Sequence, residues 1–494
     1  MERSCGILLP ISSLPSPYGI GTLGRAAMDF VDFLHRAGQR WWQILPVGHT
    51  GYGDSPYQCM SAYAGNPYFI DLDLLVSDGL LTRDEIGARP WGADEGRVDY
   101  GLLYERRYPL LEKAAARGRT RDAEAVAAFV RDNPWVEDYA LFMAVKRHFG
   151  MLSWTRWPDE DIRLHKPEAT ARYRDLLSGD VWFFTYLQYL FFRQWDALRD
   201  YARSKGVGII GDLPIYVALD SADVWSSPED FQLDEDNLPT AVAGVPPDYF
   251  SENGQLWGNP LYDYDRMERD GFGWWIRRIG GAQKLYDVIR IDHFRGFEKY
   301  WAVPYGAATA KDGRWVEGPG MKLVGVLKNW FAGLSFIAED LGTPTPELKQ
   351  LLKDSGFPGM KVLEFAFDSK EESDFLPHTY EANCVCYTGT HDNAPLMAWR
   401  KDAAAEDLAK AKEYLGLSAA EGFHWGMIRG GMGSVADLFV AQMQDYLGLG
   451  AEARMNVPSV PDGNWQWRLA KKQLTPRLAD RIARMTELYG RKPR

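Results

Sequence analysis

The sequence predicts an α/β fold, specifically a (β/α)8 TIM barrel with inserted subdomains. Short runs of apolar and β-branched residues alternate with amphipathic helical segments along the 494 residues. Eight such runs can be counted, which is the number of strands in this barrel. A doubly wound open sheet is the alternative, but no Gly-rich dinucleotide fingerprint follows any of the runs.

The first two predicted strands span residues 6–11 and 41–46, and an amphipathic helix over 26–37 connects them. This βαβ unit implies that the two strands are parallel. A loop rich in Gly, Tyr, Ser and Pro then runs from 48 to 67 and carries Tyr57 among its aromatics. Loops of this length in a compact domain are usually functional or disordered, and the aromatic side chains favour a function.

Helical periodicity replaces strand patterns over residues 75–204, so we expect a mostly helical subdomain inserted after the second strand. The block is longer than one crossover connection requires, and its clearest periodic segments are 102–116, 122–131, 137–149 and 182–203. A third buried strand is expected at 207–214. The segment 216–264 that follows predicts a loop-rich insertion over the barrel mouth, where the active site of such a fold lies.

Five further strands complete the expected barrel. They are predicted at 288–292, 334–340, 360–365, 384–388 and 453–457. Helices are expected between the last two strands, at 403–415 and 435–446, and a final capped helix at 475–490. The whole chain, 1–494, is therefore predicted to be a single catalytic barrel with two insertions.

Composition narrows the classes of partner. The formal net charge is −12 and no long Lys/Arg block offsets it, which argues against nucleic acid and anionic membranes as partners. Aromatic residues make up 14% of the chain, with 19 Trp, which favours stacking surfaces in a binding groove for a neutral ligand. The four cysteines are too few and too irregularly spaced for a disulfide framework or a zinc ribbon.

No targeting or membrane-spanning segment is expected. Pro10 comes before any adequate hydrophobic region of a signal peptide. The most apolar long stretch, 181–192, has about 12 residues, short of the roughly 20 that a spanning helix needs, and is interpreted as a buried helix. Cys384 and Cys386 are interpreted as small core residues on one strand face. These features predict a cytoplasmic protein.

Acidic residues follow several of the predicted strands at their carboxyl ends. Because those ends meet at one mouth of a barrel, we expect these side chains to lie close together; they are Asp212, Asp292, Glu339 and Asp392. A single acid after a strand more often caps the next helix or pairs with an arginine. The joint occurrence, rather than any one acid, favours a functional site.

Paired carboxylates without a phosphate loop or a cluster of metal-ligand histidines suit glycosidic-bond chemistry. Arg290 lies two residues before Asp292, on the same strand face, and would keep that acid ionised, as a nucleophile requires. Glu339 has apolar neighbours and is the better candidate for a general acid/base with a raised pKa. Asp392, beside His391, would stabilise the oxocarbenium-like transition state.

Three motifs at these strand ends resemble the amylomaltases, the 4-α-glucanotransferases of glycoside hydrolase family 77. They are Ile-Arg-Ile-Asp-His-Phe-Arg-Gly at 289–296, Ile-Ala-Glu-Asp-Leu-Gly at 337–342 and Tyr-Thr-Gly-Thr-His-Asp-Asn at 387–393. Further similar stretches cover nearly the whole chain, at 6–14, 42–72, 211–217, 244–260, 356–365 and 454–458. A chain that starts directly at the first strand resembles the short form of the family.

The resemblance implies roles for individual residues. Asp292 would be the nucleophile, Glu339 the general acid/base and Asp392 the transition-state stabiliser of a retaining double displacement. The remaining implied residues would bind the glucan. At the cleavage point these are Arg290, His391 and Asp212, with His293 as a further candidate. From loops over the groove they are Tyr57, Trp257 and Asn259. For three of these a structural role is equally open, since Tyr57 could stiffen its loop, Trp257 could be core and His293 could be a hydrogen-bonded framework residue.

The resemblance further implies the reaction. Segments of α-1,4-glucans or maltooligosaccharides would pass to the 4-hydroxyl of another glucan or of glucose, with no cofactor and no metal, and long chains could close into cycloamyloses. The wider α-amylase clan usually has a His in its first motif, whereas this chain has Asp212-Leu-Pro-Ile-Tyr216. That difference counts against an ordinary amylase, but an α-1,4-glucan hydrolase and a non-catalytic glucan-binding protein remain the alternatives. Protein partners are not indicated.

Overall fold

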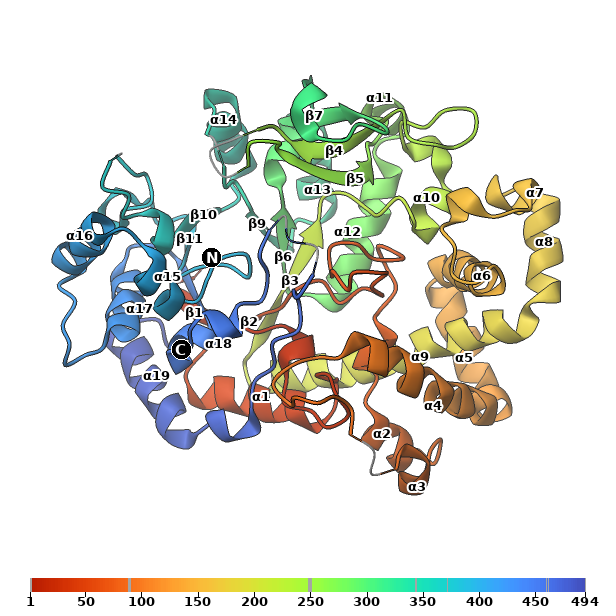
Figure 1. Ribbon diagram of the computed structural model, residues 1–494, viewed down its shortest axis with the longest axis horizontal. Coiled ribbons are helices and arrows are strands. Elements are labelled where there is room, and N and C mark those ends of the chain that lie inside the picture. The colour runs from red at the N-terminus through yellow and green to blue at the C-terminus, as the bar shows by residue number, and fades with distance from the viewer. Residues whose placement is uncertain are drawn as a thin grey trace.

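The computed structural model describes residues 2–87, 90–247, 251–342, 344–370, 372–458, 460 and 462–493. Eight parallel strands form its central sheet, in the order β10-β11-β12-β1-β2-β3-β6-β9. The backbone N–H of Ala338, at the end of β9, donates to the carbonyl of Pro358, just before β10, at 3.0 Å. The two outer strands therefore meet, and the predicted TIM barrel is confirmed (Figure 1).

The barrel strands are short and almost continuously buried, as expected of parallel strands covered on both faces. Their bounds are β1 Ser4–Leu8, β2 Trp41–Gln43, β3 Gly208–Pro214, β6 Val288–Asp292, β9 Ser335–Ala338, β10 Gly359–Val362, β11 Cys384–Tyr387 and β12 Leu438–Gln442. Close packing is visible at Gly211, where a Cβ atom would lie 2.1 Å from the ring of Tyr286. Seven of the eight strand predictions overlap an observed barrel strand.

The prediction for the eighth strand is wrong. The barrel is completed by β12, which lies inside the stretch 435–446 predicted as a helix, whereas 453–457 forms no strand. A fully buried strand lacks alternation, so its apolar run cannot be told from a buried helix by periodicity. Pairing decides the matter, because Leu438 to Gln442 align in parallel with Ser4 to Leu8 of β1.

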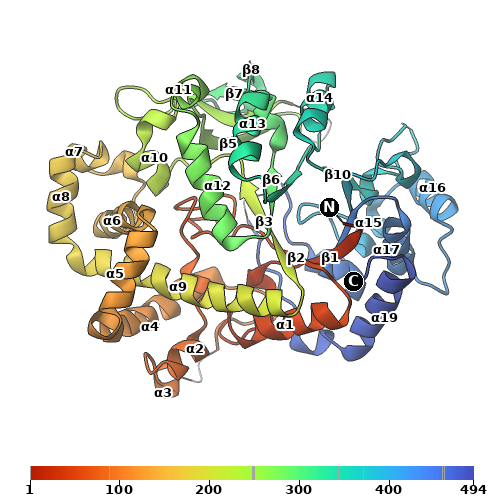
Figure 2. The same cartoon turned by 180° about the vertical axis from the view of Figure 1, so that it is seen from behind.

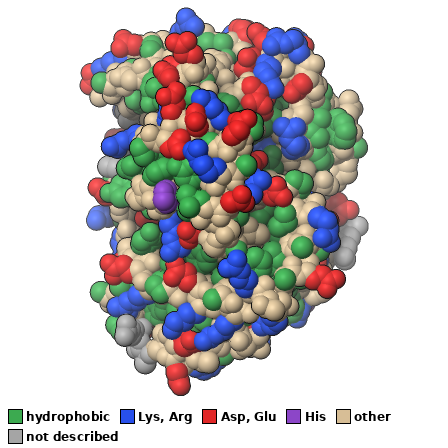
Figure 3. Space-filling model, turned by 90° about the vertical axis from the view of Figure 1, so that its right-hand side faces the viewer, with side chains coloured by type: hydrophobic (Ala, Val, Ile, Leu, Met, Phe, Trp, Pro, Cys, Tyr) green, Lys and Arg blue, Asp and Glu red, His purple; other side chains and the backbone are tan. Residues whose placement is uncertain are grey.

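Helices fill the chain between β2 and β3 and gather on one side of the barrel, at the right of Figure 1. They are α2 Leu72–Ser77, α3 Arg83–Ile86, α4 Tyr100–Arg121, α5 Ala123–Asp132, α6 Trp135–His148, α7 Glu160–Arg163, α8 Pro167–Leu176 and α9 Ser178–Ser204. Figure 3 shows the molecule from this side, with acidic and basic side chains interspersed rather than segregated. In the part of the chain that the structure describes, no helix is long and apolar enough to cross a membrane.

A second group of helices surrounds the barrel. They are α1 Arg25–Arg36, α12 Gly273–Leu285, α13 Gly320–Trp330, α14 Pro346–Ser355, α15 Leu396–Asp402, α16 Ala405–Leu415, α17 Phe423–Gly433, α18 Met443–Leu447 and α19 Pro476–Leu488. Seen from behind, α12, α9, α1 and α19 lie along the outside of β3, β2 and β1 (Figure 2). The predicted helices at 26–37, 403–415 and 475–490 correspond to α1, α16 and α19.

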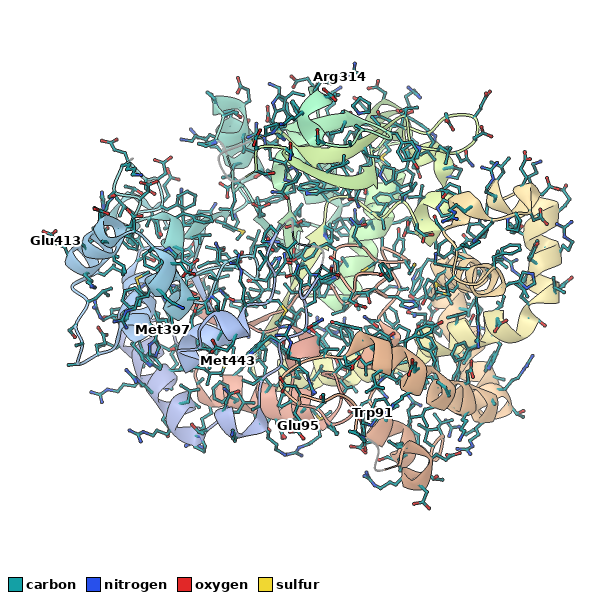
Figure 4. The ribbon with its side chains drawn as sticks, in the orientation of Figure 1. Trp91, Glu95, Arg314, Met397, Glu413 and Met443 are labelled. Atoms are coloured by element: carbon teal, nitrogen blue, oxygen red, sulfur yellow. The ribbon has the colours of Figure 1, made fainter. Side chains whose placement is uncertain are left out.

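A second sheet lies above the strand ends of the barrel, at the top of Figure 1. It is antiparallel, in the order β5-β4-β7-β8, and is built from β4 Ala241–Val245, β5 Gln255–Pro260, β7 Lys299–Pro304 and β8 Arg314–Glu317. Arg314, on β8, marks its outer edge in Figure 4. The segment 216–264, expected to be loop-rich, contains β4, β5 and the short helix α10 Ala222–Ser226 between its loops, and the short helix α11 Tyr264–Arg269 begins at its last residue. The strand β4 pairs with β7, which follows β6, and that distant partner is not visible in the local pattern.

Candidate active site

Three of the four acids singled out in the sequence come from adjacent barrel strands. Asp212 lies in β3, Asp292 is the last residue of β6, and Glu339 directly follows β9. These strands are consecutive in the sheet, and Asp392 follows β11 on the other side of β10. Parallel strands all present their carboxyl ends at one rim, so the fold places these side chains around one mouth.

Arg290 joins two of these acids. Its Nη1 atom donates to both carboxylate oxygens of Asp212, at 2.7 Å each, and to Oδ1 of Asp292 at 2.9 Å. Arg290 lies opposite Asp212 in the register of β3 and β6, which brings the two together across the sheet. The side chain of Asp212 is fully buried, whereas that of Asp292 is 28% exposed. The arginine thus holds Asp292 by one oxygen while the carboxylate still reaches the barrel mouth.

Burial decides the ionisation of Asp292. Desolvation raises the pKa of its carboxyl, and the charge of Arg290 opposes that rise, with the outcome that the pKa is about 6. We expected Arg290 to keep Asp292 ionised, and the arginine acts in that direction without fully offsetting burial. With a pKa of about 6, Asp292 is still mostly ionised at neutral pH, as a nucleophile must be.

Glu339, unlike Asp292, is mostly protonated at neutral pH. Two backbone amides hold its carboxyl group, with the N–H of His293 on Oε2 at 2.7 Å and that of Leu341 on Oε1 at 2.9 Å. Burial, and secondly the negative charge of Asp292, raise the pKa of Glu339 to about 8 despite these two hydrogen bonds. Glu339 is therefore mostly protonated at neutral pH, which is the state required of a general acid.

His293 contributes chiefly through its backbone. Its φ angle is 54°, in the left-handed region, and this conformation accompanies the hydrogen bond from its N–H to Glu339. Its ring meets the ring of Trp257 edge to face, with centroids 4.8 Å apart. Burial lowers the pKa of the imidazole to about 4, so the ring is neutral at physiological pH. Trp257, half-buried on β5, thereby connects the second sheet to the acids.

Tyr57 crosses from the long loop after β2 to the same cluster. Its hydroxyl donates to Oδ2 of Asp212 at 2.8 Å, and its ring stacks on His391 with centroids 5.1 Å apart and an interplanar angle of 15°. Trp465 lies beside both rings, with its centroid 5.8 Å from Tyr57 and 6.0 Å from His391. The tyrosine therefore links β3 to the loop that carries Asp392.

Asn259 is the member of the expected set whose side chain turns into the protein. Its Nδ2 donates to the carbonyl of Val217 at 2.8 Å, and its Oδ1 accepts from Nε2 of Gln58 at 3.0 Å. The residue is only 4% exposed. Its polar atoms thus tie β5 to the loop of Tyr57, while the other expected residues form one connected cluster around the acids.

Asp392 is the most open of the acids, with 46% of its side chain exposed. Its Oδ1 accepts from Nδ2 of Asn456 at 2.6 Å and lies 3.4 Å from Nε2 of His391. Arg454 donates to its carbonyl oxygen at 2.7 Å. Neither Asn456 nor Arg454 was assigned a role from the sequence, because their segment, 453–457, was interpreted as a barrel strand. Trp465, which lies beside Tyr57 and His391, was likewise given no role from the sequence.

The site can therefore present an ionised carboxylate, a protonated carboxyl group and a third, accessible carboxylate at one barrel mouth. This combination can attack an anomeric carbon, protonate the leaving oxygen and stabilise positive charge on a sugar ring. Among the described residues, no group of three or more His, Cys, Asp or Glu side chains is arranged to hold a metal ion.

Comparisons with known proteins agree with this chemistry. Residues 9–474 match the family model Glyco_hydro_77, described as 4-alpha-glucanotransferase. The chain is 50% identical over 484 residues to a 4-alpha-glucanotransferase of Clostridium butyricum, covering 97% of this chain and 99% of that one. It is 49% identical over 503 residues to a 4-alpha-glucanotransferase of Thermus thermophilus, covering 99% of each.

A solved structure matches the whole fold. An amylomaltase from Streptococcus agalactiae in complex with acarbose superimposes with a TM-score of 0.98 at 43% sequence identity, covering 100% of both chains. An amylomaltase from Corynebacterium glutamicum matches with a TM-score of 0.79 at 21% identity and covers 98% of this chain and 75% of that one. At that identity the second match bears on the fold alone.

Proposed function

Given that this chain belongs to glycoside hydrolase family 77 and is a 4-α-glucanotransferase, we propose that Asp292, Glu339 and Asp392 carry out the transfer by a retaining double displacement. The observation that carries this proposal is the contrast between two neighbouring acids. Asp292, held by Arg290, has a pKa of about 6, and Glu339, beside it, has a pKa of about 8. At neutral pH one is mostly a carboxylate and the other mostly a carboxylic acid.

In the first step, Asp292 attacks the anomeric carbon of the glucose unit at the cleavage point. The α-1,4 bond breaks, and its electron pair goes to the 4-oxygen of the departing chain, which takes the proton of Glu339. The donor fragment is then held as a β-linked glycosyl ester on Asp292, and Glu339 is a carboxylate.

In the second step, the 4-hydroxyl of an acceptor glucan replaces the departed chain. Glu339 takes the proton of this hydroxyl, and the hydroxyl oxygen attacks the anomeric carbon. The ester bond breaks, and its electron pair returns to the carboxylate of Asp292. Two inversions restore the α configuration. Water competes with the acceptor, so transfer requires that the groove bind glucan on the acceptor side.

The surroundings provide for binding and for water exclusion. Tyr57 arrives from the loop over 48–67 and Trp257 from β5 of the second sheet, and both contact residues of the acid cluster. Asn259 and Gln58 tie that loop and that sheet together at 3.0 Å. We assign Asp212, Arg290, His391 and Tyr57 to the sugar at the cleavage point and Trp257 to its neighbour along the chain, because aromatic faces and carboxylates suit sugar rings and hydroxyls.

The test is incubation with pure maltotriose, followed over time by separation of the products and by total reducing ends. Transfer yields glucose together with maltooligosaccharides longer than maltotriose, while the number of reducing ends stays constant. A steady rise in reducing ends without longer products would overturn transfer in favour of hydrolysis. The Asp292→Asn variant, purified in the same way, controls for contaminating activity.

Two further points belong to this proposal. Long amylose provides its own 4-hydroxyl end as acceptor, so we expect cycloamyloses that resist a glucoamylase acting from chain ends; complete digestion by that enzyme would contradict this.

A cytoplasmic location is supported by the four cysteines, all of which are free thiols.

A further inference from the structure

We propose that Asn456 is a positioning residue for Asp392, selecting which oxygen of that carboxylate faces the substrate. The inference rests on the role given to Asp392 in the proposed function. It concerns a residue of the segment that follows the last barrel strand, far from the three acids in sequence. The side chain acts through Asp392 and need not touch the glucan.

The contact between the two side chains is short and directional. Nδ2 of Asn456 donates to Oδ1 of Asp392 at 2.6 Å. His391 approaches the same oxygen, with Nε2 at 3.4 Å. No hydrogen bond to Oδ2 is found within the described parts of the chain, although the Asp392 side chain is 46% exposed. Oδ1 is therefore the anchored oxygen, and Oδ2 is the one left to accept a hydrogen bond from a sugar hydroxyl.

The anchor itself is held in place by the backbone. Arg454 donates from Nη2 to the carbonyl of Asp392 at 2.7 Å and from Nε to the carbonyl of Asn456 at 2.8 Å. One guanidinium thus joins the loop after β11 to the segment after α18. Asn464 fastens that segment from its far side, accepting from the N–H of Val457 at 2.9 Å. The Asn456 donor is consequently fixed relative to Asp392 before any ligand arrives.

An amide is well suited to this task. The terminal torsion of an aspartate is broad, so an unanchored carboxylate samples many orientations. A neutral donor narrows that range without adding a positive charge beside Asp392. The carboxylate then keeps its full negative charge for the oxocarbenium-like transition state, where preorganised charge has its greatest effect.

Charged groups on several elements surround Asp392 and must be considered in a test that uses pH. His391 lies beside it, Arg454 binds its backbone, and Asp292 on β6 interacts with it electrostatically. Tyr57, from the loop after β2, also interacts with its charge. Replacing Asn456 by Asp would place a second carboxylate about 2.6 Å from Oδ1, where repulsion between the two like charges favours uptake of a shared proton as the pH falls.

The experiment compares Asn456→Ala, Asn456→Asp and the control Asn383→Ala, whose exposed side chain donates to the carbonyl of Gly356, at 3.2 Å. We expect Asn456→Ala to lower kcat about 10- to 100-fold with KM for maltotriose changed less than about threefold, as for an interaction that matters in the transition state. Asn456→Asp should be impaired at pH 7 and recover partly at lower pH, where the carboxylate pair binds a proton. Asn383→Ala, an exposed asparagine before β11 and so at the opposite end of that strand from Asp392, should retain kcat within about threefold and the wild-type pH profile.

A double-mutant cycle separates this inference from the proposed function. If Asn456 acts through Asp392, adding Asn456→Ala to Asp392→Asn should cause no further loss. If Asp392→Asn is itself as active as wild type, the role of Asp392 in the proposed function fails. The positioning role fails, and the proposed function stands, if Asp392→Asn is inactive but Asn456→Ala keeps its kcat. It also fails if Asn456→Ala and Asn456→Asp lose thermal stability and activity in proportion, with an unshifted pH profile.

Discussion

Nη1 of Arg290 lies 2.9 Å from Oδ1 of Asp292, and the same nitrogen also binds both oxygens of Asp212. Asp292, the proposed nucleophile, is therefore coupled, through one atom, to an acid that is completely buried. This arrangement has two consequences, since Arg290 both lowers the pKa of Asp292 and compensates the buried charge of Asp212. Four predictions follow from this and from the contacts of Glu339.

Replacing Arg290 by Met should destabilise the protein and shift its activity. Loss of the guanidinium leaves buried carboxylates unpaired, which costs about 3–5 kcal/mol in comparable sites. The pKa of Asp292 should rise, so the acid limb of kcat/KM should move to higher pH. Thermal unfolding and a pH–rate profile measure the two effects. Arg36→Met is the matched control, because Arg36 pairs with Asp480 on the exposed surface; equal losses of stability in both variants would contradict the account.

The two acids can be told apart with a substrate whose leaving group needs no proton. Glu339→Gln should lose nearly all activity on maltotriose but still form the glycosyl enzyme from α-maltosyl fluoride, since fluoride departs without a general acid. Asp292→Asn should react with neither substrate, so it should release no fluoride from α-maltosyl fluoride and no glucose from maltotriose. Fluoride release, followed with an ion-selective electrode, is the measurement. Fluoride release by Asp292→Asn at the wild-type rate would refute its assignment as the nucleophile.

The pH dependence of kcat/KM should be bell-shaped with its maximum at neutral pH. The proposed mechanism requires Asp292 without its proton and Glu339 with its proton. Rising acidity protonates Asp292 around pH 6, and rising alkalinity removes the proton of Glu339 around pH 8. The two limbs belong to the interacting pair rather than to either acid alone. Glu339→Gln, assayed with α-maltosyl fluoride, should lack the alkaline limb, and an unchanged limb would assign it to another group.

Glu339 should also make stability depend on pH. The pKa of this group in the folded protein, about 8, is above its ordinary value of 4.5, so the folded state binds the proton more tightly than the unfolded state. Its contribution to stability is present below pH 4.5 and is lost as the pH rises towards 8. Glu339→Gln escapes this loss, so its melting temperature should exceed that of the wild type by roughly 2 °C or more at pH 8.5, with a smaller gain at pH 4.5. A gain independent of pH would point to packing instead.

Local patterns were enough to predict the barrel and its acids. Each buried strand forms from a short apolar run, and a strand that ends in an acid shows this in consecutive residues, as in Val288–Asp292. Parallel strands all end at the same rim, so the order of elements along the chain already brings Asp292 and Glu339 to one mouth. The position of Arg290, two residues from Asp292, also followed from the period of a strand.

Contacts between distant segments were decided only in the tertiary structure. The eighth strand, β12, is recognisable by its pairing with β1, more than 400 residues earlier in the chain, and not by its own pattern. The sheet of β4, β5, β7 and β8 requires strands from two separate connections of the barrel, one between β3 and β6 and the other between β6 and β9. Asn456 reaches Asp392 because the chain turns back over the barrel mouth after α18.

The same division applies to the chemistry of the site. The sequence by itself determined which residue types stand at the strand ends, because covalent order and strand period place them there. Only the tertiary structure decided their protonation, since the pKa values of Asp292 and Glu339 depend on burial and on each other. Desolvation and hydrogen bonds from neighbouring segments are properties of the folded molecule, and a linear pattern does not contain them.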